Sequence, residues 1–132
     1  MKKTLVGLSV AAGLLAVASS SPAVAGQLIV ADMPQMFAVG STELPAGRYE
    51  FSELNVESGT FKVLNAETRK SVIVQSVTRL AMRSDGQPVI VLDKMGDKEY
   101  LSEIYPGDVD GYYFGGAPGQ HAHVTVHAAK KK

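Results

Sequence analysis

The clearest folding signal in the chain is a hairpin pattern at residues 89–105, which read VIVLDKMGDKEYLSEIY. Two runs rich in β-branched, aromatic and other apolar residues flank Gly96-Asp97, which suits a two-residue turn with glycine at its first central position. Such a turn fixes the register, and three facing pairs follow from it: Lys94–Glu99, Leu92–Leu101 and Ile90–Glu103. The first pair joins opposite charges and favours this register. Neither face of the hairpin is purely apolar, so alternation does not indicate which face meets the core.

Outward from this hairpin, the chain after residue 26 shows no sustained helical period. Short apolar, β-branched and aromatic runs recur instead, bounded by turn residues at a spacing of roughly 8–12 residues. The predicted strands are residues 27–31, 36–39, 48–54, 60–65, 71–82, 89–95, 98–105, 112–114 and 121–128. This pattern predicts an all-β fold, an antiparallel sandwich or small barrel of about seven to nine short strands.

Two further turns have identifiable chemistry. Asp85-Gly86 suits a tight hairpin turn, which predicts that residues 71–82 fold back against residues 89–95. Pro45-Ala46-Gly47 reads as a turn in which the glycine takes a positive φ angle.

Three motifs in this β-rich chain resemble a known group of proteins. They are FAVG at residues 37–40, LPAGRY at 44–49 and GDKEYLSE at 96–103. In this order they are similar to the pattern F-x-V-G, L-P-A-G-x-Y, G-D-x-x-Y/F-L-S-E of small secreted β-proteins of acidobacteria. The resemblance implies secretion and a β fold, and it brings no activity with it. The chain departs from the pattern over residues 111–127, where we expect any individual function to lie.

The first 25 residues have the three parts of a secretory signal peptide. Two lysines precede an apolar run over residues 5–17, and the small residues Ala-Val-Ala at 23–25 suit a cleavage site. The run is shorter than the ~20 residues that a membrane-spanning helix needs. The sequence therefore predicts export to the periplasm or beyond and no stable membrane span after cleavage. It also predicts one β-rich domain over residues 26–132, ending in a short basic tail at 130–132.

Composition and missing motifs exclude several classes of function. The chain has 13 basic and 13 acidic residues and no cysteine. This balance argues against nucleic-acid binding, and the absence of cysteine excludes a thiol nucleophile or a disulfide framework. The sequence contains no nucleophile-elbow, phosphate-loop or zinc-protease motif. We therefore expect a non-enzymatic protein that acts by binding or by assembly through its sheet edges, with a small hydrolase as the weakest alternative.

The only three histidines lie in one predicted strand, at His121, His123 and His127. Alternation places all three on one face, with His121 and His123 ~7 Å apart and His127 ~13 Å beyond. The first two could share a Zn²⁺ or Cu²⁺ ion weakly, since no third ligand is apparent from the sequence. A metal-handling protein is therefore the second hypothesis. The competing interpretation is an edge strand whose outward polar face lies in water, with no metal or other cofactor.

An aromatic group precedes the histidines and comprises Tyr105, Tyr112, Tyr113 and Phe114. Exposed rings of this kind stack on sugars or anchor a protein partner. The same rings could instead close one end of the core. The sequence therefore leaves two alternatives open, a binding surface for a carbohydrate or protein partner and a core plug.

Overall fold

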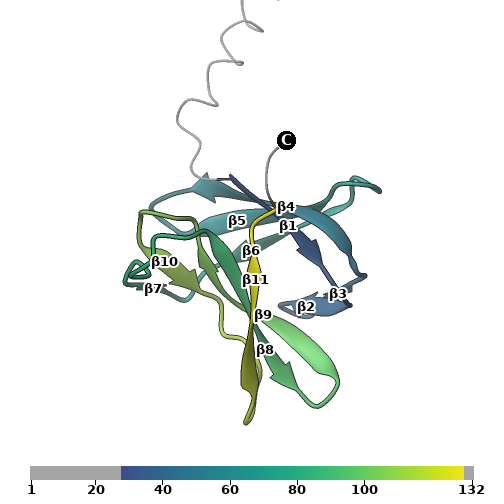
Figure 1. The fold of residues 1–132 in the computed structure, drawn as a ribbon. Helices are drawn as coiled ribbons and strands as arrows, with labels where there is room; N and C mark the ends of the chain where they lie inside the picture. The colour runs from purple at the N-terminus through teal and green to yellow at the C-terminus, as the bar shows by residue number, and fades with distance from the viewer. Residues whose placement is uncertain (1–27, 130–132) are drawn as a thin grey trace, which may run out of the picture.

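The computed structural model describes residues 28–129, which form eleven strands arranged in two sheets (Figure 1). The first sheet is antiparallel and has the order β1-β4-β5-β6. Its strands are β1 (Leu28–Met33), β4 (Gly47–Asn55), β5 (Thr60–Asn65) and β6 (Ser71–Gln75). The predicted signal peptide (residues 1–25) and basic tail (130–132) lie outside the described residues.

The second sheet has the order β11-β8-β9-β10-β7, and β2 joins it by a parallel pairing with β9. Its strands are β2 (Phe37–Val39), β3 (Thr42–Leu44), β7 (Thr78–Leu80), β8 (Val89–Met95), β9 (Lys98–Tyr105), β10 (Gly111–Tyr113) and β11 (Ala122–His127). The all-β prediction is confirmed, and of its two forms the sandwich is the observed one, because the two sheets do not close into a barrel.

The core lies between the sheets and is filled from both. Tyr49 and Phe51 on β4 share the inward face, as their spacing predicts, and both are fully buried. The Tyr49 ring meets Phe37 edge-on at 5.1 Å between centroids, and its hydroxyl donates a hydrogen bond of 2.7 Å to the Pro45 carbonyl. From the second sheet, Ile90, Leu92, Leu101 and Ile104 complete the same cluster. Within residues 28–129, no helix has the length and apolar character needed to cross a bilayer.

The β8–β9 hairpin forms with the predicted two-residue turn, and Gly96 takes φ 68°. The pairs Lys94–Glu99 and Leu92–Leu101 face each other as expected. A bulge between Val91 and Leu92 then shifts the register, so Ile90 faces Ile104 and not Glu103. Ser102 is the extra residue, and its insertion allows both Leu101 and Ile104 to point into the core.

The hairpin predicted at Asp85-Gly86 is wrong, although the turn itself exists. Gly86 takes φ 62°, and its N–H donates to the Arg83 carbonyl at 3.1 Å. The predicted strand 71–82 is divided, because Ser76 N–H bonds to the Gly59 carbonyl, in the turn between two strands of the first sheet, and Val77 N–H bonds to the Tyr113 carbonyl in the second sheet. The chain changes sheets at this point, so β6 pairs with β5 and β7 with β10, while β8 lies between β9 and β11.

The turn before β4 behaves as its sequence predicts, because Gly47 takes φ 148°. The strand β3 was not predicted, since its three residues Thr-Glu-Leu show no apolar alternation. The additional strand β3 and the division of residues 71–82 into β6 and β7 explain why eleven strands are observed where nine were predicted.

Candidate metal centre

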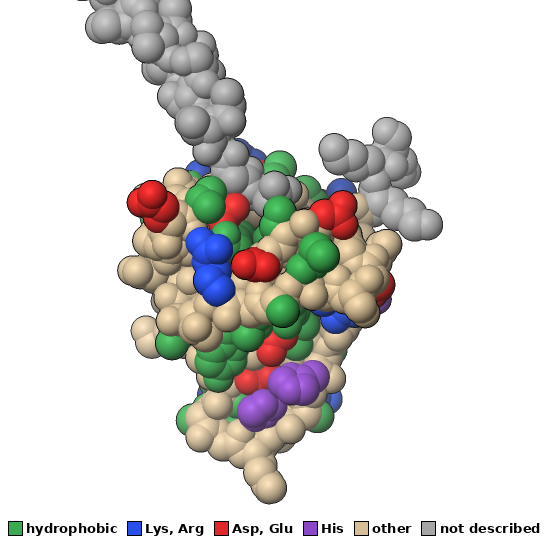
Figure 2. All heavy atoms as spheres, turned by 90° about the vertical axis from the view of Figure 1, so that its left-hand side faces the viewer, with side chains coloured by type: hydrophobic (Ala, Val, Ile, Leu, Met, Phe, Trp, Pro, Cys, Tyr) green, Lys and Arg blue, Asp and Glu red, His purple; other side chains and the backbone are tan. Residues whose placement is uncertain are grey.

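The histidines lie on and beside β11, the edge strand of the second sheet, which pairs antiparallel with β8. Val124 and Val126 pack against the core, so His123 and His127 point outward, as alternation predicts. Histidine side chains gather on one face of the molecule, beside acidic atoms (Figure 2). His127 stands opposite Val89, at the far end of the strand from His121.

The acidic partner of the two histidines is Asp93 on β8, which faces His123 directly across the ladder. His123 Nδ1 lies 3.0 Å from Asp93 Oδ1, and His121 Nε2 lies 3.4 Å from Oδ2. The two imidazole rings meet edge-on with centroids 5.2 Å apart. The structure thus brings His121 and His123 together and adds a third side chain of a type that binds metal ions.

Two backbone contacts from the loop before β11 hold this group in place. Ala117 N–H donates to Asp93 Oδ2 at 3.0 Å, which fixes the carboxylate. His121 Nδ1 lies 2.7 Å from the Gly119 carbonyl, and because a carbonyl only accepts, this nitrogen carries the proton. In the neutral imidazole the lone pair then lies on Nε2, the nitrogen nearer Asp93. A backbone carbonyl that fixes the tautomer in this way is typical of metal-binding histidines.

Asp93 is a buried acid without a full set of partners. Its side chain is 1% exposed, and Oδ1 has no hydrogen-bond donor among the described residues. The 3.0 Å contact from His123 Nδ1 does not supply one, because it lacks the direction of an N–H···O bond. Within residues 28–129 the only basic side chains that contact the Asp93 carboxylate are the two imidazoles, which carry a positive charge only when protonated. A buried carboxylate in this state is costly unless a cation compensates it.

The spacing of the three side chains suits a small cation. One ligand atom from each of Asp93, His121 and His123 lies within 4.8 Å of the others. Ligand atoms at ~2.0–2.1 Å from a tetrahedral zinc ion are ~3.3 Å apart. His123 lies 3.0 Å from one carboxylate oxygen of Asp93 and His121 lies 3.4 Å from the other, so small side-chain movements would bring one oxygen and both nitrogens to that spacing. Three protein ligands leave one tetrahedral position free.

Gly116 allows the loop between β10 and β11 to pass close to Asp93. A Cβ atom on this residue would lie 1.9 Å from Asp93 Oδ2 and 3.0 Å from Ser102 Oγ, another buried atom with no hydrogen-bond partner. Gly116 also takes φ 60°, a backbone angle that residues other than glycine rarely adopt. The loop can therefore deliver the Ala117 N–H to the carboxylate only with glycine at position 116.

The aromatic residues divide between core and surface. Tyr112 is 3% exposed and Phe114 packs against the core, where their rings lie 5.0 and 5.7 Å from that of Phe61. Tyr112 therefore lies in the core and Phe114, partly buried, packs against it, which is the arrangement that the core-plug alternative expects. Tyr105 and Tyr113 are half-buried, and their hydroxyls donate to Glu103 Oε1 and the Gly115 carbonyl.

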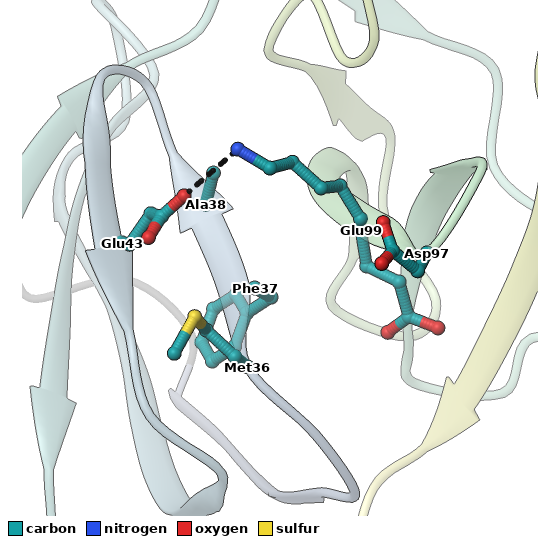
Figure 3. Close-up of a pocket in the computed structure, with 7 residues that line it drawn as sticks. Met36, Phe37, Ala38, Glu43, Asp97 and Glu99 are labelled. Atoms are coloured by element: carbon teal, nitrogen blue, oxygen red, sulfur yellow. Dashed lines mark hydrogen bonds and ion pairs between the residues drawn. The ribbon is translucent and has the colours of Figure 1, made fainter.

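A separate cavity of about 260 Å³ opens between the β2–β3 hairpin and the start of β9 (Figure 3). An ion pair of 3.3 Å joins Lys98 Nζ to Glu43 Oε2 across it. Glu99 also lines it and is buried, and among the described residues no ion pair joins Glu99 to Lys94. The cavity holds none of the site residues predicted from the sequence, and no group of three metal-binding side chains found within residues 28–129 includes its acids.

The sequence did not identify Asp93 as a candidate third ligand. Twenty-seven residues separate it from the first histidine of the group, and only the pairing of β8 with β11 brings them together. The one local signal is an acid directly after four apolar strand residues, VIVLD at 89–93. An acid that interrupts a run of core residues indicates either a paired charge or a site.

Comparisons with known proteins give no relative from which a function could be transferred, since no family model, curated protein or solved structure matches this chain.

Proposed function

We propose that this protein is an exported, non-enzymatic β-sandwich that binds a divalent transition-metal ion through Asp93, His121 and His123. The observation that carries the proposal is the buried Oδ1 of Asp93, which lacks a hydrogen-bond donor and lies beside two imidazoles. A cation in this position would compensate the carboxylate and use the free lone pair of His121. Two nitrogen ligands and one oxygen suit Zn²⁺ and Cu²⁺, and the general order of affinities favours Cu²⁺.

The structure supports metal binding better than it supports recognition of a carbohydrate or protein partner by aromatic rings. Tyr112 is buried in the core, and Phe114 packs one side of its ring against the core, which leaves little of these two rings for stacking on a ligand. Export rests on the signal-like pattern of residues 1–25, and the similarity to secreted acidobacterial β-proteins agrees with it. The absence of catalytic motifs supports a binding role over an enzymatic one.

Isothermal titration calorimetry of the purified, metal-free protein with Zn²⁺ and Cu²⁺ tests the proposal. We expect one ion per chain with a Kd below about 1 µM, which corresponds to about −8 kcal/mol. The double variant His121→Ala/His123→Ala should lose this binding and keep its fold, because neither ring belongs to the core cluster.

His127→Ala is the matched control, since His127 lies on the same strand with the same outward direction but opposite Val89. The affinity of the His127→Ala variant for Zn²⁺ should equal that of the parent protein. Equal losses of affinity in the control and in the double variant would indicate nonspecific binding by surface histidines and would overturn the proposal.

A further inference from the structure

The three proposed ligands are held very differently by the protein. Asp93 is 1% exposed and receives the Ala117 N–H, and the side chain of His121 is 27% exposed with its Nδ1 bonded to Gly119. His123 is 59% exposed, and none of the hydrogen bonds among the described residues involves its ring. His123 is therefore the ligand that the protein holds least firmly.

The surroundings leave the solvent side of the site open. β11 is an edge strand, so no further strand lies beyond the histidines in this sheet. Asp93 lies beneath the imidazoles, and three ligands leave a tetrahedral ion with one free position. Structural zinc sites have four protein ligands and closed surroundings, and this site has neither.

If the proposed metal site is correct, we infer that it exchanges its ion with an external donor by an associative route, and that His123 is the first protein ligand to leave. The incoming donor supplies a lone pair to the free position and forms one bond to the metal. The bond from His123 Nδ1 then breaks, and the imidazole retains its lone pair. The step transfers no electron, and the ion keeps its charge.

This order of events identifies the kind of partner. Asp93 and His121 retain the ion while the donor attaches, so the acceptor does not have to wait for spontaneous release of the metal. The acceptor needs an accessible nitrogen or sulfur donor, which are the ligand types that Zn²⁺ and Cu²⁺ prefer. The inferred role is therefore metal carriage and transfer, in contrast to structural metal binding.

Stopped-flow transfer of Zn²⁺ from the loaded protein to the chromophoric chelator 4-(2-pyridylazo)resorcinol tests the route. We expect the observed first-order rate to rise in proportion to chelator concentration over a range of about tenfold. A rate independent of chelator concentration would mean that the ion leaves first and would overturn the inference, while the metal site itself would stand. An absence of Zn²⁺ binding in calorimetry would overturn the proposed function and the inference together.

The order of ligand loss is tested by comparing the two single variants. Because Gly119 pre-orients His121, we expect His121→Ala to weaken Zn²⁺ binding about tenfold more than His123→Ala, the scale typical of outer-shell orientation. His123→Ala should also transfer its ion faster than the parent, because the ligand that must be displaced is already absent. Slower transfer from His123→Ala, or the opposite order of affinities, would overturn the assignment of His123 as the first ligand to leave.

Discussion

Glu53 and Asp93 are both buried carboxylates in one small sandwich, with 4% and 1% of their surface exposed. Glu53 lies on β4 of the first sheet and accepts a hydrogen bond from the Tyr112 hydroxyl on β10 of the second. Asp93 has one oxygen fixed by Ala117 and another with no donor. The first acid joins the two sheets, whereas the second is left with capacity to bind a cation. Between these two acids, the hydrogen-bond partners and the neighbouring imidazoles, and not burial, distinguish the structural acid from the candidate ligand.

The largest expected effect comes from exchanging each acid for its amide. Asp93→Asn should weaken metal binding by more than about 100-fold, beyond the range of outer-shell changes, because a direct anionic ligand is lost. The metal-free variant should melt no lower than the parent, since the amide removes a buried charge that lacks a full set of partners. Calorimetry and thermal denaturation measure the two effects.

Glu53→Gln is the reciprocal variant. It should leave metal affinity unchanged and reduce the free energy of unfolding by about 1–2 kcal/mol, because the bond from Tyr112 loses its charged acceptor. Loss of metal binding in Glu53→Gln, together with normal binding in Asp93→Asn, would reverse the roles assigned to the two acids.

The next effect concerns the loop that covers Asp93. Gly116→Ala places a Cβ atom where it collides with the carboxylate, so metal affinity should fall by about 10–100-fold. Gly115→Ala is the matched control, because Gly115 also has a positive φ, 104°, but its Cβ would meet nothing within 4 Å. The control should lose stability through backbone strain and retain its affinity for Zn²⁺. Equal affinities in the two variants would show that the loop does not position Asp93.

On the structural side of the comparison, Tyr112→Phe should lower the free energy of unfolding by about 1.5–3 kcal/mol at pH 7, the range for a hydrogen bond to a charged group. Burial, followed by the bond to Glu53, raises the pKa of Tyr112 to about 12. Folding therefore favours the protonated hydroxyl, and its contribution is full below the unfolded pKa of ~10 and is lost as the pH rises to about 12.

Denaturant titrations at pH 7, 10 and 12 measure this dependence. Tyr112→Phe should lose less stability than the parent between pH 10 and 12. Burial, followed by the bond to Glu103, also raises the pKa of Tyr105 to about 12. Tyr105 therefore accounts for part of the alkaline loss of stability that remains in Tyr112→Phe. An alkaline loss as large in Tyr112→Phe as in the parent would show that Tyr112 does not contribute to it.

The smallest effect is expected at an exposed acid with ordinary partners. The Arg83 guanidinium, followed by the Gln87 N–H, lowers the pKa of Asp85 to about 2. The charged form is favoured in the folded state, so its contribution is present above the unfolded pKa of ~3.9 and is lost as the pH falls to about 2. Asp85→Asn should melt slightly below the parent at pH 7, and the difference should disappear at pH 2. A difference that persists at pH 2 would have another cause.

Local patterns predicted most of the strands, since β5, β8 and β9 have the boundaries that alternation and turn residues indicate. The sequence was a poorer guide to which strands pair. The Asp85-Gly86 turn has residues typical of a hairpin, but the strands that it joins, β7 and β8, do not pair with each other. The same limit applied to the site. Alternation placed the histidines together on one face of the strand, whereas Asp93 became their neighbour only through the long-range pairing of β8 with β11. Nothing in the local sequence encodes that pairing.

The pairing of β8 with β11 also has a consequence in time. His121 and His123 follow ten of the eleven described strands in chain order, so a growing or partly translocated chain presents Asp93 long before its imidazole neighbours. A chain interrupted before β11 would lack two of the three proposed ligands, whatever the state of its other strands. Occupancy of the site would therefore mark chains whose synthesis and sheet assembly are finished, and an ion offered earlier would find only a solitary carboxylate.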